Sequence, residues 1–364
     1  MPSSISLQSA LATDDDDCLK AGLVYIDDQG PGIRREKVGD DFRYVAPDGS
    51  IIDDLQTLAR IKALAIPPAY TQVWICPDPF GHIQATGRDA RGRKQYRYHQ
   101  QWHEVRDATK YQQLEEFARA LPRIRRAVER DLKTRGLGRQ KVLAVVVRLL
   151  EMTLIRVGTQ KYARSNKSYG LTTLRRRHTR VIGDRVRFQF KGKSGVRHDV
   201  TVNDRRVARI VKRCMEIPGH ELFTYLDDDG VKRVAGSADV NAYLKQVSGT
   251  DFTAKHYRTW AASVYAMAQL QARDAEWRLT ADAALDRPLS SAALQRTVAE
   301  VVKETAQRLG NTPTVCRKCY IHPAVIEAWM AGDLPVRCTA PGPRGLNADE
   351  RRLYAFLRSW HAAC

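Results

Sequence analysis

The hydrophobic pattern of this chain changes near Trp102, and the change sets the fold class. Over residues 21–99, short apolar runs are separated by turn signals such as Pro47-Asp48-Gly49, which is typical of a small antiparallel sheet. Beyond Trp102, apolar residues recur every three or four positions, which predicts helices over 104–120, 122–136 and 139–156. We therefore predict an α+β fold, with a small N-terminal antiparallel β-sheet domain over 21–99 and a larger, mainly α-helical domain over 100–364.

One clear β-hairpin interrupts the helical part. Apolar residues alternate with polar ones over 186–190 and again over 196–202, and the turn between them contains Gly192 and Gly195. Lys193 therefore lies at a hairpin tip, where a flexible ammonium could reach a bound substrate and donate a proton. A solvated turn lysine is the ordinary alternative.

The net charge points to a polyanionic partner. The chain has 60 Lys and Arg against 41 Asp and Glu, a net charge of +19, which is large for a metabolic enzyme. Anionic membrane is the rival partner, but no window approaches the roughly 20 apolar residues of a spanning helix, and the N-terminus lacks the pattern of a signal peptide. Residues 1–20 are Ser-rich and then acidic, which predicts a disordered tail.

The seven cysteines form no regular disulfide framework, so free thiols in a reducing cytosol are expected. Cys316 and Cys319 form a CxxC pair, with His322 and Cys338 downstream. A zinc site would need a cleaner second pair, and the residues around the CxxC are basic and lead directly to Tyr320. We therefore predict neither a metal nor another cofactor.

Two basic segments have the composition of nucleic-acid contacts. In 87–99, cations alternate with Gln and Tyr residues, and glycines let the backbone approach a ligand closely. Arg and Lys can bind phosphates, while Gln and Tyr can reach bases or stack on them; a solvated loop is the plainer alternative. Residues 161–180 contain seven cations, including Arg175-Arg176-Arg177, which is dense enough for a phosphate-binding surface.

The stretch before Tyr320 has strong local signals. A helical pattern stops at Gly310, a usual residue after a helix, and Thr312 followed by Pro313 predicts the start of another short helix. Phenol has an unperturbed pKa of about 10, and nearby cations favour its ionised form. Tyr320 could therefore attack a phosphate group; a half-buried tyrosine on a basic helix face is the alternative.

Four further residues complete a set that suits phosphate chemistry. Arg156 ends a buried helix, and Arg258 lies in a helix that Thr253 caps. Lys193 lies at the hairpin tip, and Asn311 directly follows Gly310. Two arginines can neutralise a pentavalent transition state, an amide can add a hydrogen bond, a lysine can protonate a leaving oxygen, and a tyrosine can hold the phosphorus covalently. Taken singly, Arg156 could balance a helix dipole and Arg258 could be an ion-pair partner.

These residues lie in motifs that resemble those of the type IB DNA topoisomerases, in the compact form found in poxviruses and many bacteria. The resemblance extends over about residues 21–360. Five segments carry it in the same order: Gly87-Arg88-Asp89 through Tyr98, Ile155-Arg156-Val157-Gly158 through Leu174, Phe190-Lys191-Gly192-Lys193-Ser194-Gly195, Tyr257-Arg258-Thr259-Trp260, and Gly310-Asn311-Thr312-Pro313 through Tyr320.

The resemblance implies that Tyr320 is the nucleophile, that Arg156 and Arg258 hold the scissile phosphate, and that Lys193 is the general acid. Asn311 stands where poxvirus members carry His, and because an amide does not titrate near neutral pH, it would act only as a donor. His256 stands where the family more often has Asp, which leaves open how Arg258 is oriented. The candidate DNA contacts are Arg88, Arg91, Arg93, Lys94, Gln95, Tyr96, Tyr98, Lys161, Tyr169, Arg175, Arg317 and Lys318.

The function implied by the resemblance is DNA relaxation by a monomeric, nucleoid-associated cytoplasmic enzyme of bacterial type. Its two domains would clamp double-stranded DNA. Cleavage of one strand would leave a 3′-phosphotyrosyl link and a free 5′-hydroxyl, and rotation of the free end before religation would relax supercoils without ATP or metal.

Two alternatives remain open. Tyrosine site-specific recombinases share this chemistry, but they usually show His-x-x-Arg, whereas His256-Tyr257-Arg258 is one residue short, and they pair the site with a helical N-terminal domain. A non-catalytic architectural DNA-binding protein fits the charge but leaves the five-residue set unexplained.

The stop at Gly310 and the restart at Pro313 lead to one more hypothesis. Without DNA, this segment could hold Tyr320 away from the pocket formed by the two arginines.

Overall fold

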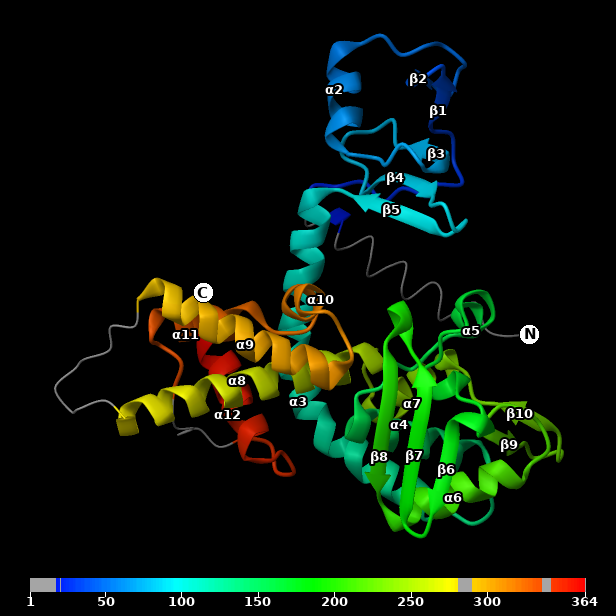
Figure 1. Cartoon of the computed structure of the whole chain (residues 1–364), viewed down its shortest axis with the longest axis vertical. Helices are drawn as coiled ribbons and strands as arrows, with labels where there is room; N and C mark the ends of the chain where they lie inside the picture. Colours follow the sequence, from blue (N-terminus) through cyan, green and yellow to red (C-terminus); the bar gives the residue numbers. More distant parts are fainter. Residues whose placement is uncertain (1–17, 20, 281–289, 336–341, 364) are drawn as a thin grey trace. The chain divides into compact units, whose positions relative to one another are not determined.

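The computed structural model describes residues 18–19, 21–280, 290–335 and 342–363 (Figure 1). The chain divides into two compact units, Met1–Tyr111 and Gln112–Cys364, and the division falls inside helix α3 (Gln100–Leu132). An antiparallel sheet forms the first unit and helices dominate the second, which confirms the predicted α+β fold class. The predicted tail, apart from residues 18 and 19, lies outside the described residues.

A five-stranded sheet with the order β2-β1-β3-β4-β5 and antiparallel neighbours forms the first unit. Helix α2 (Leu55–Ala63) starts at Asp54, whose carboxylate accepts from two backbone N–H groups of the first turn. Its residue Ile61 packs on Ile33 and Ile75 of the sheet. The strands are β1 (Ile33–Val38), β2 (Asp41–Val45), β3 (Thr71–Ile75), β4 (Ile83–Arg88) and β5 (Lys94–Tyr98).

A second, three-stranded sheet in the larger unit has helices packed on one of its faces (Figure 1). Its order is β6-β7-β8, and β7 alternates exposed and buried residues along its whole length, as the sequence predicts. The strands are β6 (Thr179–Ile182), β7 (Arg185–Lys191), β8 (Arg197–Asn203), and the separate pair β9 (Thr224–Leu226) and β10 (Lys232–Val234). The helices after α3 are α4 (Arg139–Thr153), α5 (Gln160–Asn166), α6 (Arg205–Glu216), α7 (Ser237–Ser248), α8 (Ala254–Thr280), α9 (Ser291–Leu309), α10 (Pro313–Cys319), α11 (Pro323–Ala331) and α12 (Ala348–Ala363).

Two helix boundaries differ from the sequence prediction. The helices expected over 104–120 and 122–136 form one helix, α3, which continues through Pro122. Proline removes one backbone hydrogen bond, but the apolar residues on both sides, among them Leu121 and Ile124, are fully buried and hold the helix together. Helix α4 ends at Thr153, because Leu154 adopts a left-handed conformation with a φ of 54°, so Arg156 lies beyond the helix rather than at its last residue.

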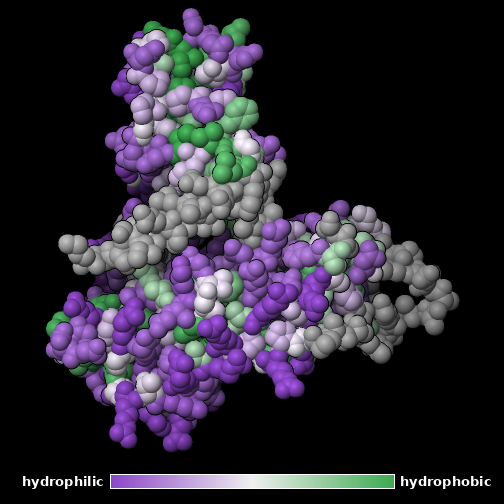
Figure 2. Space-filling model, turned by 180° about the vertical axis from the view of Figure 1, so that it is seen from behind, coloured by the Kyte–Doolittle hydropathy of each residue, from purple (hydrophilic) through white to green (hydrophobic). Residues whose placement is uncertain are grey.

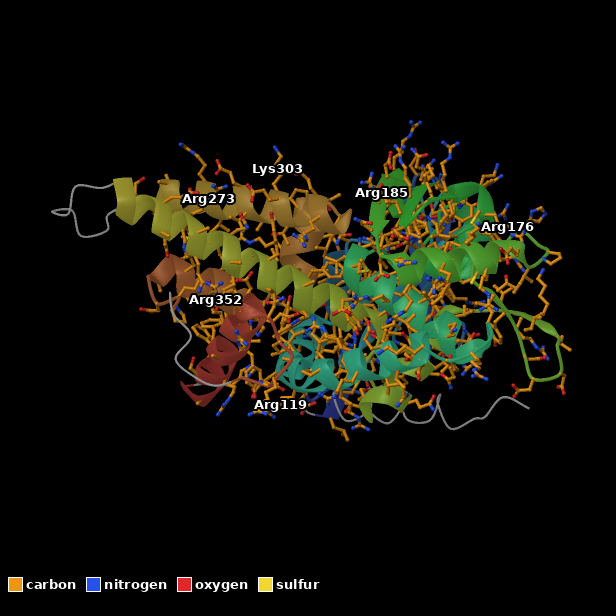
Figure 3. All side chains as sticks on the ribbon, turned by 90° about the horizontal axis from the view of Figure 1, so that it is seen from below. Arg119, Arg176, Arg185, Arg273, Lys303 and Arg352 are labelled. Atoms are coloured by element: carbon orange, nitrogen blue, oxygen red, sulfur yellow. The ribbon has the colours of Figure 1, made fainter. Side chains whose placement is uncertain are left out.

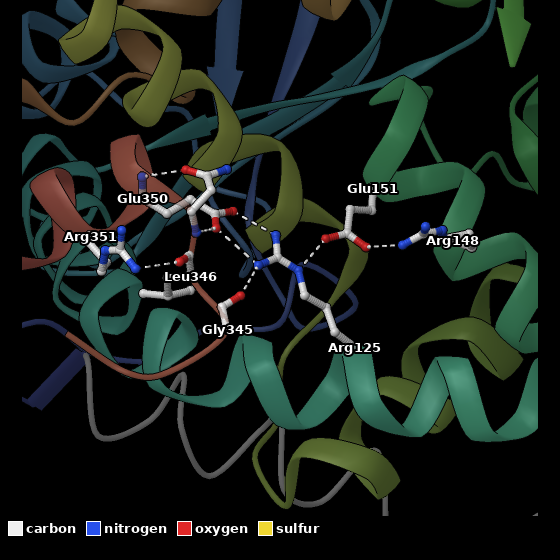
Figure 4. A network of polar contacts seen from close by, with 8 residues as sticks. Arg125, Arg148, Glu151, Gly345, Leu346, Glu350 and Arg351 are labelled. Atoms are coloured by element: carbon white, nitrogen blue, oxygen red, sulfur yellow. Dashed lines mark hydrogen bonds and ion pairs between the residues drawn. The ribbon is translucent and has the colours of Figure 1, made fainter. Parts of the chain in front are cut away.

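An ionic network centred on Arg125 ties three helices of this unit together (Figure 4). Arg125 of α3 donates to Glu151 of α4 at 2.6 Å and to Glu350 of α12 at 2.7 and 3.0 Å. A fourth bond, of 2.8 Å, reaches the carbonyl oxygen of Gly345. Glu350 is only 6% exposed, so this network fixes the C-terminal helix from inside the fold.

The positive charge is spread over the surface. Exposed cations project from several elements in Figure 3, including Arg119 of α3, Arg185 of β7 and Lys303 of α9. Hydrophilic residues cover most of the described surface visible in Figure 2. Within the described residues, no helix is both long and apolar enough to span a bilayer.

Candidate active site

The turn between α9 and α10 forms the centre of the candidate site. Helix α9 ends where Gly310 takes a left-handed φ of +61°, and the side chain of Thr312 caps α10 with Pro313 in its first turn. Both local predictions are therefore confirmed. The short connection leaves Asn311 between the two helices, with its backbone N–H bonded to the carbonyl oxygen of Ala306 at 2.9 Å.

The two arginines converge on the side-chain oxygen of Asn311. Arg156 Nη2 and Arg258 Nη2 both donate to Oδ1, the second at 3.2 Å. Carbonyl groups hold the rest of each guanidinium: Arg156 Nη1 donates to Gly310 O at 3.1 Å, and Arg258 Nη2 donates to Leu309 O at 2.9 Å. Arg258 Nη1 also donates to Leu154 O, next to the end of α4. Two like charges are thus held side by side, an arrangement that an anion between them would stabilise.

Burial affects the pKa and the hydrogen bonding of Arg258 and Asn311. Arg258 is only 3% exposed, and burial lowers its pKa to about 10, with the charge of Arg156 acting in the same direction and Tyr320 opposing it. Two buried donors of the site, Arg258 Nε and Asn311 Nδ2, have no hydrogen-bond acceptor among the described residues. Because buried donors are normally paired, these two atoms mark a place where a ligand oxygen would be bound.

Tyr320 lies beside Arg258 at the end of α10. The guanidinium carbon of Arg258 is 5.0 Å from the centroid of the tyrosine ring. Burial alone would raise the pKa of Tyr320, but the charges of Arg258 and Arg156 outweigh it and lower the pKa below the ordinary phenol value. The hypothesis that the segment holds Tyr320 away from the arginines without DNA is therefore wrong for this structure. The pocket is assembled because Asn311 Oδ1 accepts hydrogen bonds from both guanidinium groups.

Ser263 is a site residue that sequence reasoning missed. Its Oγ accepts a hydrogen bond from His322 N at 2.9 Å and lies 3.3 Å from the carbonyl oxygen of Tyr320. Ser263 is fully buried in α8, the helix that also carries Arg258. The one available signal was a serine among buried alanines such as Ala262 and Ala266, which does not reveal a partner 57 residues away.

We expect Ser263→Ala to slow the strand cleavage that the resemblance implies by about fivefold, because it removes a hydrogen bond of about 1 kcal/mol that fixes the Tyr320 backbone. DNA affinity should change little. The measurement is single-turnover cleavage of duplex DNA, with Ser359→Ala as the matched control, since Ser359 Oγ also donates to a helix carbonyl, that of Phe356, at 2.8 Å. Equal rates for the two variants would contradict the role of Ser263.

Lys193 is not assembled with the other four residues. It is exposed at the tip of the β7–β8 hairpin, as the alternation predicts, in a short 3₁₀ turn. Its Nζ lies 6.0 Å from the ring centroid of Tyr162 on α5. The structure thus brings together Arg156, Arg258, Asn311 and Tyr320, and leaves Lys193 on a separate element.

His256 does not orient Arg258. Its Nδ1 accepts from the backbone N–H of Thr253 at 2.9 Å, which closes the first turn of α8. The other nitrogen, Nε2, lies 3.0 Å from Gln113 Oε1 and can donate to it. Burial lowers the pKa of His256 to about 4, so the imidazole is neutral. The carbonyl groups described above take the place of a charged partner behind Arg258.

Asp89 organises the basic segment of the first unit. Its carboxylate accepts from the backbone N–H groups of Arg91 and Arg93 at 3.0 and 2.9 Å, from Arg93 Nε at 2.7 Å and from Gln95 Nε2 at 3.0 Å. The Arg93 side chain is the main cause that lowers the pKa of Asp89 to about 2. The side chains of Arg93 and Gln95 are therefore already held by hydrogen bonds to Asp89.

The other candidate DNA contacts of this segment differ in their partners within the protein. Lys94 pairs with Asp28 and lies 5.4 Å from the ring centroid of Tyr96. Arg88 donates to a side chain and a carbonyl of the same unit. Tyr96 is 44% exposed and stacks on Tyr98, with ring centroids 5.9 Å apart. A tyrosine pair with one exposed ring, flanked by cations, is a surface on which bases can stack.

In the larger unit the candidate contacts occupy two places. Lys161 is exposed on α5, and the guanidinium carbon of Arg175 lies 5.6 Å from the ring centroid of Tyr169. Arg317 and Lys318 are exposed on α10, where they line a groove of about 680 Å³ together with residues of α9 and α11. These two cations are therefore surface groups rather than the pair that lowers the pKa of Tyr320.

The CxxC pair contributes thiols near the site. Cys316 and Cys319 are free, and burial raises the pKa of Cys316 to about 11. No group of three His, Cys, Asp or Glu residues able to hold a metal ion occurs within the described ranges. Cys338, which the zinc alternative involves, lies outside those ranges.

Comparison with known proteins gives two family matches. Residues 99–331 match the model described as the eukaryotic DNA topoisomerase I catalytic core, and residues 41–89 match the bacterial DNA topoisomerase IB N-terminal domain. The chain is 33% identical over 303 residues to DNA topoisomerase 1B of Acanthamoeba polyphaga mimivirus, covering 82% of this chain and 88% of the relative. It is 23% identical over 288 residues to DNA topoisomerase 1B of Vaccinia virus (strain Western Reserve), covering 78% and 83%.

Proposed function

The chain belongs to the type IB DNA topoisomerase family, and from this premise we propose that it relaxes supercoiled duplex DNA by cutting and resealing one strand. A nucleophilic mechanism of this kind conserves the energy of the cut bond in the enzyme–DNA link, so no nucleotide is needed. The torsional strain of the DNA drives the net reaction.

In the proposed cleavage step, Tyr320 Oη attacks the scissile phosphorus. The phenol loses its proton, a bond forms between Oη and phosphorus, and the bond from phosphorus to the 5′-oxygen breaks. Lys193 donates a proton to that oxygen, so the products are a 3′-phosphotyrosyl link and a free 5′-hydroxyl. Religation is the reverse, with the 5′-hydroxyl as the nucleophile. For this step the hairpin must bring Lys193 from its exposed position to the leaving oxygen.

Arg156, Arg258 and Asn311 would bind the non-bridging oxygens of the phosphate. Negative charge accumulates there in the pentavalent transition state, and fixed donors that need no rearrangement stabilise it. The removal of one such donor typically costs ~10²- to 10³-fold in rate. The observation that carries the proposal is the pair of unpaired buried donors, Arg258 Nε and Asn311 Nδ2, beside the phenol of lowered pKa.

We further propose that tyrosines and cations at the surface of both units bind the duplex around the cut. The first unit would contribute Tyr96, Tyr98 and the cations around them, and the second Lys161, Arg175 and Lys318. Phosphate contacts of this number make binding strongly dependent on salt. We also propose that the protein acts as a monomer, on nucleoid DNA in a bacterial cytoplasm.

Relaxation of a supercoiled plasmid in EDTA without ATP tests the proposed function. We expect a ladder of relaxed topoisomers, since every group in the mechanism is a side chain. A requirement for added divalent metal or for nucleotide would contradict the mechanism. Recombination between two copies of a specific site, in place of relaxation, would favour a tyrosine recombinase, and binding without either reaction would favour an architectural protein.

A further inference from the structure

The imidazole of His198 lies between Gly192, which precedes Lys193, and Gly310, which precedes Asn311. His198 lies on β8 opposite Phe190 of β7, and the two rings stack with centroids 4.7 Å apart. A side chain added at Gly192 would place its Cβ 2.6 Å from His198 Nε2, and one added at Gly310 would lie 2.5 Å from Cε1. Both positions are therefore closed to larger residues by the same ring.

The two glycines belong to segments that are far apart in the sequence. Gly192 is buried directly before Lys193, and its backbone N–H donates to the carbonyl oxygen of Val196 at 2.7 Å across the hairpin tip. Gly310 ends α9 directly before Asn311. The ring of His198 is thus packed between the base of the Lys193 turn and the backbone that positions Asn311.

The charge state of His198 suits this position. Burial chiefly, and then the charges of Arg156 and Arg258, lower the pKa of His198. The ring is therefore neutral at pH 7 and adds no third positive charge to the pair of arginines. A positively charged side chain in its place would repel the guanidinium groups of Arg156 and Arg258.

We propose that His198 is a positioning residue that docks the β7–β8 hairpin against the Gly310–Asn311 turn and thereby sets the reach of Lys193 toward the leaving 5′-oxygen. The inference rests on the proposed function, because it assigns a role within the same reaction. The ring acts through the hairpin and does not itself bond to the phosphate.

Two DNA substrates that differ only in the leaving atom can distinguish this positioning role from a general effect on the fold. Protonation by Lys193 matters for a 5′-oxygen, which is a poor leaving group, but not for a 5′-bridging sulfur, which leaves as a stable thiolate. We would measure single-turnover cleavage of two duplexes that carry a site mapped with the wild-type protein, one with the ordinary phosphodiester and one with the 5′-bridging phosphorothiolate.

For His198→Ala we expect cleavage of the ordinary duplex to fall by ~10- to 100-fold, within the range for general acid catalysis, and cleavage of the phosphorothiolate to stay within about threefold of the wild-type rate. Lys193→Ala should show the same selectivity with a larger loss. His220→Ala, which alters an exposed histidine, should leave both rates unchanged. Thermal unfolding of each variant checks the fold, and His198→Asn is a smaller change if the alanine variant does not fold.

The variant Gly310→Ala tests the same contact from the other side. Its added Cβ would displace the His198 ring, so the variant should also lose more activity on the ordinary duplex than on the phosphorothiolate. Because both changes disturb one contact, the double variant with His198→Ala should lose less than the product of the single losses. Equal slowing of both duplexes by His198→Ala, or no slowing, would overturn the inference. Failure of the wild-type protein to cleave either duplex would instead overturn the proposed function.

Discussion

Replacing Tyr320 by Phe is expected to abolish covalent attachment to DNA and to reduce plasmid relaxation by on the order of 10⁴-fold or more, since no other group can take over the bond to phosphorus. The ring itself stays, so its contact with Arg258 and the fold should persist. DNA binding should remain close to that of the wild-type protein. Relaxation, denaturing gel mobility of the DNA-linked protein, and a binding titration measure the three quantities.

Tyr265→Phe is the matched control for this experiment. Tyr265 lies on α8, and the guanidinium carbon of Arg308 is 4.9 Å from its ring centroid, so the substitution removes a hydroxyl from a second tyrosine beside an arginine. It should leave relaxation unchanged. Relaxation that survives in Tyr320→Phe would contradict the assignment of the nucleophile, as would loss of activity that is explained entirely by unfolding.

Arg125→Ala should cause the largest loss of stability, about 3–5 kcal/mol in the free energy of unfolding, because it leaves buried carboxylates without their partner. Glu350 and Glu151 are 7% and 18% exposed in their side chains. Denaturant titration at pH 7 measures the effect. Arg187→Ala breaks an ion pair with Asp199 whose side chains are 50% and 49% exposed, and it should cost no more than about 1 kcal/mol.

The pH dependence gives a second readout of the same network. Burial would raise the pKa of Glu350, but hydrogen bonds from Arg125 and from the backbone of Asn347 lower it below the ordinary glutamate value. A carboxyl whose pKa is lowered in the folded state stabilises the fold above its unfolded pKa, about 4.3, and this stabilisation is lost as pH falls through the folded pKa. The wild-type protein should therefore lose stability over this acid range more steeply than Arg125→Ala. Equal stability of the Arg125 and Arg187 variants would contradict this account.

Local signals made part of the site predictable from the sequence. Gly310, Thr312 and Pro313 act on their own neighbouring backbone, so the break before Asn311 was readable without any tertiary information. The alternation over 186–202 likewise placed Lys193 at a hairpin tip. The resemblance to the topoisomerase family then supplied the roles, which no single motif carried.

The remaining features depend on long-range packing. Helix α4 ends three residues earlier than its pattern suggests, because Leu154 adopts a left-handed conformation. The carbonyl group of Leu154 then accepts a hydrogen bond from Arg258 of another helix. Ser263 and His198 looked like an ordinary helix serine and a strand histidine. Their partners, Tyr320 and Gly310, are more than 50 residues distant in the sequence, so only the folded chain reveals them.

The most direct test of the central claim is the identity of the residue that carries DNA during the reaction. Wild-type protein would be mixed with duplex DNA, denatured, digested with nuclease and protease, and the modified peptide sequenced by mass spectrometry. The account predicts a nucleotide joined through its 3′-phosphate to the Oη of Tyr320. A nucleotide on any other residue, a linkage through a 5′-phosphate, or relaxation without any covalent adduct would contradict it.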